Sequence, residues 1–155
     1  MGLDFEKYAS AGSEVLHQLD KKLGGQGKEH AGRVLRSVLH ALRSRLTMQE
    51  SLQFMAPLPM ALKGLYVEGW RFAKPDRHIS TPEDFAQAVI EQDGRTAWRD
   101  FSNLDEARAA ATAVMQVLAG FVPAGEWQDI RAIFPQPLRQ EVDQWQKAES
   151  VKSSE

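Results

Sequence analysis

The fold is decided by residues 35–50, which read LRSVLHALRSRLTMQE. The apolar residues of this stretch recur at steps of three, one, three and four, at Leu35, Val38, Leu39, Leu42 and Leu46. That spacing places them on one stripe of an α-helix, which must be buried against other elements. Thr47 and Glu50 then match a capping box, in which each side chain accepts a hydrogen bond from the other residue's backbone amide. The stretch therefore predicts two consecutive helices with a sharp turn between them.

The helical period continues upstream of this stretch. We expect a first helix from about Asp4 to Leu23 and a second from about Glu29 onward, because Gly24 and Gly25 suit the left-handed end of a helix. The apolar face of the first helix is expected to comprise Phe5, Tyr8, Val15, Leu16, Leu19 and Leu23.

Downstream, prolines and caps mark the boundaries. The run from Pro57 to Pro59 must end the helix that Thr47 starts, and a fourth helix is expected through Leu62 towards Trp70. Residues 71–80 are polar and broken by proline, which is typical of a connector. The sequence Thr-Pro-Glu-Asp at 81–84 then starts a new helix, with proline in the first helical position. We expect an all-α protein.

The second half of the chain repeats the pattern of the first. A shift of 76 positions aligns several apolar residues and a helix-breaking proline without a gap: Ala31 with Ala107, Val38 with Val114, Leu42 with Leu118, Pro59 with Pro135, and Leu62 with Leu138. This predicts two degenerate four-helix repeats, at about 4–70 and 81–147. Neither repeat is large enough to supply much of a core alone, so we expect one compact domain over 1–150 and a flexible tail at 148–155.

Composition limits the class of protein. The chain has 155 residues, 43% of them hydrophobic and 26% charged, with a net charge of −2, as in soluble globular proteins. It has no cysteine, which excludes disulfides, thiolate metal sites and cysteine nucleophiles. The N-terminus shows neither a basic leader nor an apolar segment, and no apolar run approaches the roughly 18 residues of a membrane span. We expect a cytoplasmic protein that does not interact with membranes.

Two segments resemble a known family. The stretch from Leu35 to Thr47, followed by the stretch from Leu58 to Trp70, is similar to the bacterial domain-of-unknown-function family catalogued as number 2267. The resemblance extends from about Phe5 to Trp145, and the family pattern is likewise helical and doubled. It implies a fold, a bacterial origin and a cytoplasmic location, but no activity or catalytic residues.

The second helix carries a basic face. Arg33, Arg36, His40 and Arg43 are spaced by three, four and three residues, about 130° round the helix from the apolar stripe, and are expected to project into water. They are candidate anion-binding residues, although the absence of interleaved aromatic residues disfavours nucleic acid and favours a solvated face. A second interpretation is assembly, because residues 1–80 hold 12 Lys and Arg against 8 Asp and Glu, whereas residues 81–155 hold 7 against 13.

Two further surfaces remain as candidates. The alanine-rich run at 107–119 offers almost no charge and is expected at the centre of the fold, with self-association as the alternative. Core packing is expected for most of the four tryptophans, at positions 70, 98, 127 and 145, but Tyr66, Trp70 and Phe72 are candidates for a partner or ligand surface.

Motifs for catalysis, phosphate binding or metal ligation are not found in the sequence, so we assign no catalytic residue, metal ligand or cofactor. We expect a non-enzymatic interaction or assembly module that binds a protein partner or a second copy of itself. Polyanion binding through the basic face and a small-ligand or metal carrier remain the alternatives.

Overall fold

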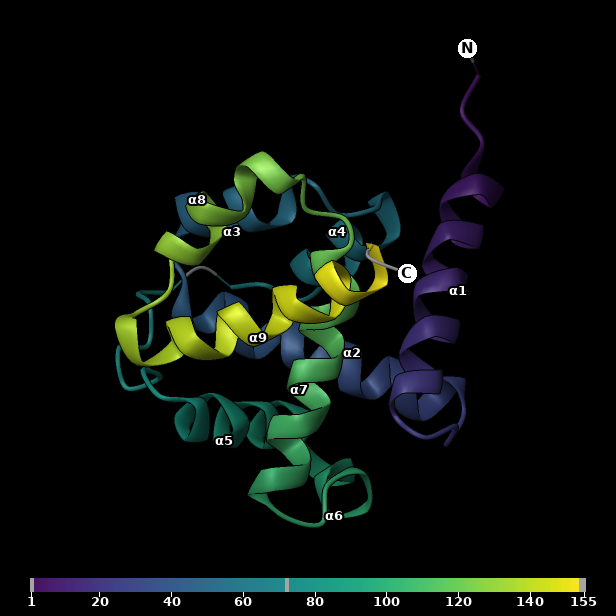
Figure 1. Cartoon of the computed structure of the whole chain (residues 1–155). Helices are drawn as coiled ribbons and strands as arrows, with labels where there is room; N and C mark the ends of the chain where they lie inside the picture. The colour runs from purple at the N-terminus through teal and green to yellow at the C-terminus, as the bar shows by residue number, and fades with distance from the viewer. Residues whose placement is uncertain (1, 72, 154–155) are drawn as a thin grey trace.

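Every regular element in the described part of the chain is a helix (Figure 1). The computed structural model describes residues 2–71 and 73–153. The α-helices are α1 (Phe5–Lys22), α2 (Lys28–Arg45), α3 (Met48–Met55), α4 (Met60–Val67), α5 (Pro82–Asp93), α6 (Ala97–Asp100), α7 (Leu104–Ala119), α8 (Trp127–Ala132) and α9 (Gln136–Ser153). Short 3₁₀ turns at Gly94–Thr96 and Ala124–Glu126 precede α6 and α8. The predicted all-α fold is confirmed.

The helices begin where the sequence places their caps. Thr47 and Glu50 form the predicted capping box of α3, with the Glu50 carboxylate accepting from the Thr47 amide at 2.9 Å. Thr81 and Asp84 form a second capping box at the start of α5. Gly24 and Gly25 end α1 with positive φ angles. Local side-chain chemistry therefore sets these boundaries.

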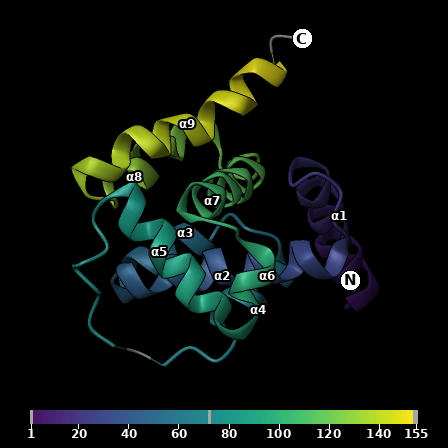
Figure 2. The ribbon, with the colours of Figure 1, turned by 90° about the horizontal axis from the view of Figure 1, so that it is seen from below.

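The core surrounds α2 and α7. Helix α5 packs against both of them, while α9 packs on α7 and α4 packs on α2. The alanine-rich helix α7 is buried on most sides and reaches α1, α2, α5 and α9, so its predicted place at the centre of the fold is confirmed. Figures 1 and 2 show α1 at the edge of this body, where it contacts α2, α4 and α7.

The helix boundaries are compatible with a doubled unit. Helices α7 and α9 begin at Leu104 and Gln136, each 76 residues after the first residues of α2 and α4. The aligned pair Val38 and Val114 is fully buried, as are other aligned positions in these helices. The duplication itself stays a prediction.

Two aromatic residues lie on the surface, one of them against expectation. Phe5 was expected on the core face of the first helix, but it is 73% exposed, because the first turn of α1 lies beyond the helices that cover Val15 and Leu19. Trp98 is 80% exposed, on a short turn that points away from the core. Part of the predicted tail, 148–153, has helical backbone at the end of α9, and residues 154–155 lie outside the described residues.

Candidate functional site

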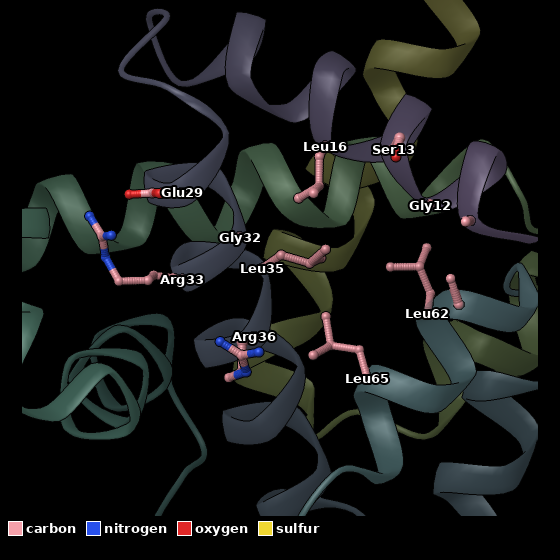
Figure 3. Close-up of a pocket in the computed structure, with 12 residues that line it drawn as sticks. Gly12, Ser13, Leu16, Glu29, Gly32, Arg33, Leu35, Arg36, Leu62 and Leu65 are labelled. Carbon is pink, nitrogen blue, oxygen red and sulfur yellow. The ribbon is translucent and has the colours of Figure 1, made fainter.

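A groove lies between α1, α2 and α4 and encloses about 570 Å³ (Figure 3). Twelve residues line it: Ala9, Gly12, Ser13 and Leu16 from α1, Glu29, Gly32, Arg33, Leu35 and Arg36 from α2, and Ala61, Leu62 and Leu65 from α4. The walls are mainly apolar or carry no side chain. Figure 3 shows Gly12 near one end of the groove and Arg33 with Glu29 near the other. Its volume is in the range of small-ligand and peptide sites.

Small residues give the groove its shape. A Cβ atom built at Gly12 would lie only 2.9 Å from the Cβ atom of Ala61, so α1 and α4 approach closely because position 12 has no side chain. A Cβ atom built at Gly32 would meet nothing within 4 Å, so this position opens into the groove. Glycine inside a helix costs about 1 kcal/mol relative to alanine, which makes Gly12 and Gly32 a signal the sequence interpretation missed.

Arg36 lies at the charged side of the groove and is available to a ligand. Its Nε atom donates to the Glu68 carboxylate at 3.1 Å, and both side chains are about half exposed. Exposed ion pairs of this kind contribute only about 0–1 kcal/mol, because water competes for both partners. An incoming carboxylate can therefore replace Glu68 at little cost.

Arg33, in contrast, ties α2 to α6. Its guanidinium donates to both carboxylate oxygens of Asp100 at 2.8 Å, and the Asp100 side chain is fully buried. The hydrogen bond to Asp100 raises the pKa of Arg33. Burial works to raise the pKa of Asp100, but hydrogen bonds from Arg33 and Asp93 outweigh it and leave that pKa lowered. This ion pair fixes the charged end of the groove.

The same cluster holds a second carboxyl group and a histidine. Burial, followed by the neighbouring Asp100, raises the pKa of Asp93 to about 6. The Thr96 hydroxyl donates to Asp93 Oδ1 at 2.7 Å, while the buried Oδ2 has no hydrogen-bond partner when Asp93 is ionised. His30 lies 4.0 Å from Asp100 and lines a smaller cavity of about 160 Å³ beside it. One proton shared between the carboxyl groups of Asp93 and Asp100 would give Asp93 Oδ2 the hydrogen bond that it otherwise lacks.

The predicted basic face does not project into water as a unit. Arg43 donates to the backbone carbonyls of Tyr66 and Glu68, at 2.6 and 2.7 Å, and so binds the end of α4. His40 Nε2 lies 2.9 Å from the carbonyl of Leu65, and burial lowers the pKa of His40. The expectation of a solvated face is wrong for Arg33, His40 and Arg43, because helices that are distant in sequence pack over them.

The structure separates the three aromatic candidates. Tyr66 has no exposed surface, and its hydroxyl donates a hydrogen bond to Ser51 Oγ at 2.7 Å inside the core. It is therefore not available to a partner. Burial raises the pKa of Tyr66 to about 12. Trp70 is half-buried against Tyr66 and lines a pocket of about 320 Å³ near His40. Phe72 lies outside the described residues.

A family model for an uncharacterized conserved protein, DUF2267, matches residues 12–141. The chain belongs to this family. A search of curated proteins finds no match. The DUF2267 match covers the groove from Gly12 onward, including its walls on α2 and α4, but it excludes Phe5 and Ala9 on the first turns of α1.

The DUF2267 match agrees with the resemblance seen in residues 35–70 and supplies no activity. Among the side chains that the structure describes, no three His, Asp or Glu residues are grouped closely enough to hold a metal ion. None of the described helices is both long and apolar enough to cross a bilayer.

Proposed function

We propose that this protein is a binding module whose groove between α1, α2 and α4 accepts the apolar side of a helical segment from a partner protein. The observation that carries the proposal is the pairing of an apolar groove of about 570 Å³ with the half-exposed guanidinium of Arg36 at its side. Leu16, Leu35 and Leu65 offer contacts to apolar side chains.

The small groove residues favour a helix as the ligand. Gly32 keeps the groove open and lets a partner's side chains approach the backbone of α2, whereas Gly12 lets α1 and α4 close one end of the groove. An acidic residue on the partner helix would replace Glu68 as the partner of Arg36. The proposal therefore predicts a ligand with apolar residues at helical spacing and a nearby carboxylate.

The experiment fills the groove and leaves the fold intact. Gly32→Leu places a side chain in the groove, and Gly64→Leu is the matched control, because Gly64 lies on α4 outside the groove and a Cβ atom there also meets nothing within 4 Å. The probe is the anionic apolar dye 1-anilinonaphthalene-8-sulfonate, whose fluorescence rises on apolar surfaces.

We expect Gly32→Leu to weaken binding of the dye at least tenfold, which corresponds to about 1.4 kcal/mol, and Gly64→Leu to bind as the wild type does. Equal binding by all three proteins would place the dye elsewhere and contradict the proposal. Circular dichroism spectra that match for the two variants would show that both are folded.

Polyanion binding is a second candidate function, because one pocket is lined by two of the predicted anion-binding residues together with Trp70. His40, Arg43 and Trp70 line it with the exposed Arg71 and Lys74. The test is binding of a single-stranded oligonucleotide at increasing salt: a steep salt dependence that Lys74→Glu reduces supports this function, and salt-independent binding opposes it. A cytoplasmic location and a bacterial origin stay predictions.

A further inference from the structure

We propose that the turn formed by residues 94–100, which carries Trp98, is a second docking surface and binds an acidic segment of a partner protein. Trp98 is 80% exposed and is the most exposed of the large apolar residues in the described part of the chain. Tryptophan is among the residues that folding normally covers, and exposed tryptophan and arginine are enriched where protein partners bind most tightly.

Two arginines flank this indole ring. Arg95 lies three residues before Trp98, a spacing that makes two side chains neighbours on a helical turn, and Arg99 follows Trp98 directly. Both arginines are exposed. Neither arginine forms an ion pair within the described part of the chain. Like charges four residues apart on a helix disfavour folding slightly, so the isolated fold gains nothing from this arrangement.

Contacts at both ends of this turn hold its backbone in place. Asp100 ends it and is fully buried against Arg33, and Phe101 follows in the core. At the other end, the Thr96 hydroxyl donates to the carbonyl and the carboxylate of Asp93, at 2.9 and 2.7 Å. Because the backbone of this turn is already held in place, binding there costs little backbone conformational entropy.

The chemistry of the three side chains identifies the partner. The two guanidinium groups pair with carboxylates in a fixed, two-pronged geometry, and the indole ring packs against an apolar side chain between them. An acidic protein segment with one central apolar residue supplies both. This surface is separate from the groove, because none of the three residues lines it.

The test uses a fluorescein-labelled peptide of glutamates around one central leucine, with binding followed by anisotropy. We expect Trp98→Ala and the double variant Arg95→Gln/Arg99→Gln each to weaken binding at least fivefold. The matched control is Lys7→Gln/Arg77→Gln, which removes two exposed cations that line neither the groove nor the pocket beside Trp70 and should bind as the wild type does. Gly32→Leu should also leave binding unchanged, so this inference can fail or hold independently of the groove.

Several results would overturn the inference. The first is that the wild type does not bind the peptide, and the second is that the control variant loses as much binding as Arg95→Gln/Arg99→Gln. The third is that Trp98→Ala binds the peptide as the wild type does. Tighter binding of phosphatidylglycerol vesicles or single-stranded DNA through the same three residues would assign the surface to lipid or nucleic acid instead. The substituted side chains are exposed, and unchanged circular dichroism spectra would confirm that each variant is folded.

Discussion

The close approach of α1 and α4 at Gly12 predicts a sharp difference between two glycines. Gly12→Ala would place a Cβ atom 2.9 Å from that of Ala61, whereas ordinary contacts begin at 3.4 Å, so the two helices must separate by about 0.5 Å. Overpacking of this kind costs about 1–3 kcal/mol, and the better helix propensity of alanine returns about 1 kcal/mol. We expect Gly12→Ala to lower the free energy of unfolding by about 0–2 kcal/mol.

A control substitution at Gly32 and an exchange of the two residues in contact, Gly12 and Ala61, make this prediction specific. Gly32→Ala meets no atom within 4 Å and should raise the free energy of unfolding by about 0.5–1 kcal/mol. The swap Gly12→Ala/Ala61→Gly removes the clash and should return stability to near the wild-type value, a coupling of about 1–3 kcal/mol. Urea unfolding followed by circular dichroism measures the wild type, Gly32→Ala and the three variants of the cycle, which are Gly12→Ala, Ala61→Gly and the swap. A stabilising Gly12→Ala, with effects that simply add in the swap, would refute the close packing of α1 and α4.

Three further predictions concern buried polar groups. Asp100→Asn leaves the partly exposed Arg33 without its carboxylate and should cost about 2–3 kcal/mol in urea unfolding; a loss below about 0.5 kcal/mol would contradict this. Since the pKa of Asp93 is raised to about 6, its protonated form favours folding, so this contribution is complete below about pH 4 and is lost as the pH rises through 6. The free energy of unfolding of wild type relative to Asp93→Asn should therefore fall between pH 4 and 7, and parallel pH profiles would count against it. Tyr66→Phe leaves the Ser51 hydroxyl without its donor and should cost about 1–2 kcal/mol in thermal or urea unfolding, whereas an unchanged stability would show that the bond contributes nothing.

Local signals explain how much of the fold could be predicted from sequence. The capping residues Thr47 and Thr81 and the prolines after α3 set helix ends through contacts within a few residues, so the pattern alone places them well. The stripe of α2 is buried as expected because its period is strong. The alanine-rich α7 has no charged side that could face water over most of its length, which fixes its central position.

Contacts between distant segments explain what could not be predicted. The partner of Arg33 is Asp100, 67 positions later, and no local pattern links them. Periodicity alone does not show that the first turn of α1 extends past its neighbours, so Phe5 was assigned to the core. The groove also depends on three helices that meet only in the folded protein, although the two glycines inside α1 and α2 mark its position.

The central claim is that the groove between α1, α2 and α4 is the binding surface. Backbone amide shifts of ¹⁵N-labelled protein, titrated with a synthetic amphipathic helix of Leu, Ala and Glu, test it most directly. We expect saturable shifts concentrated in residues 9–16, 29–36 and 61–65, and weaker binding when Lys replaces Glu in the peptide. Shifts concentrated on other helices, or the same affinity for both peptides, would contradict it.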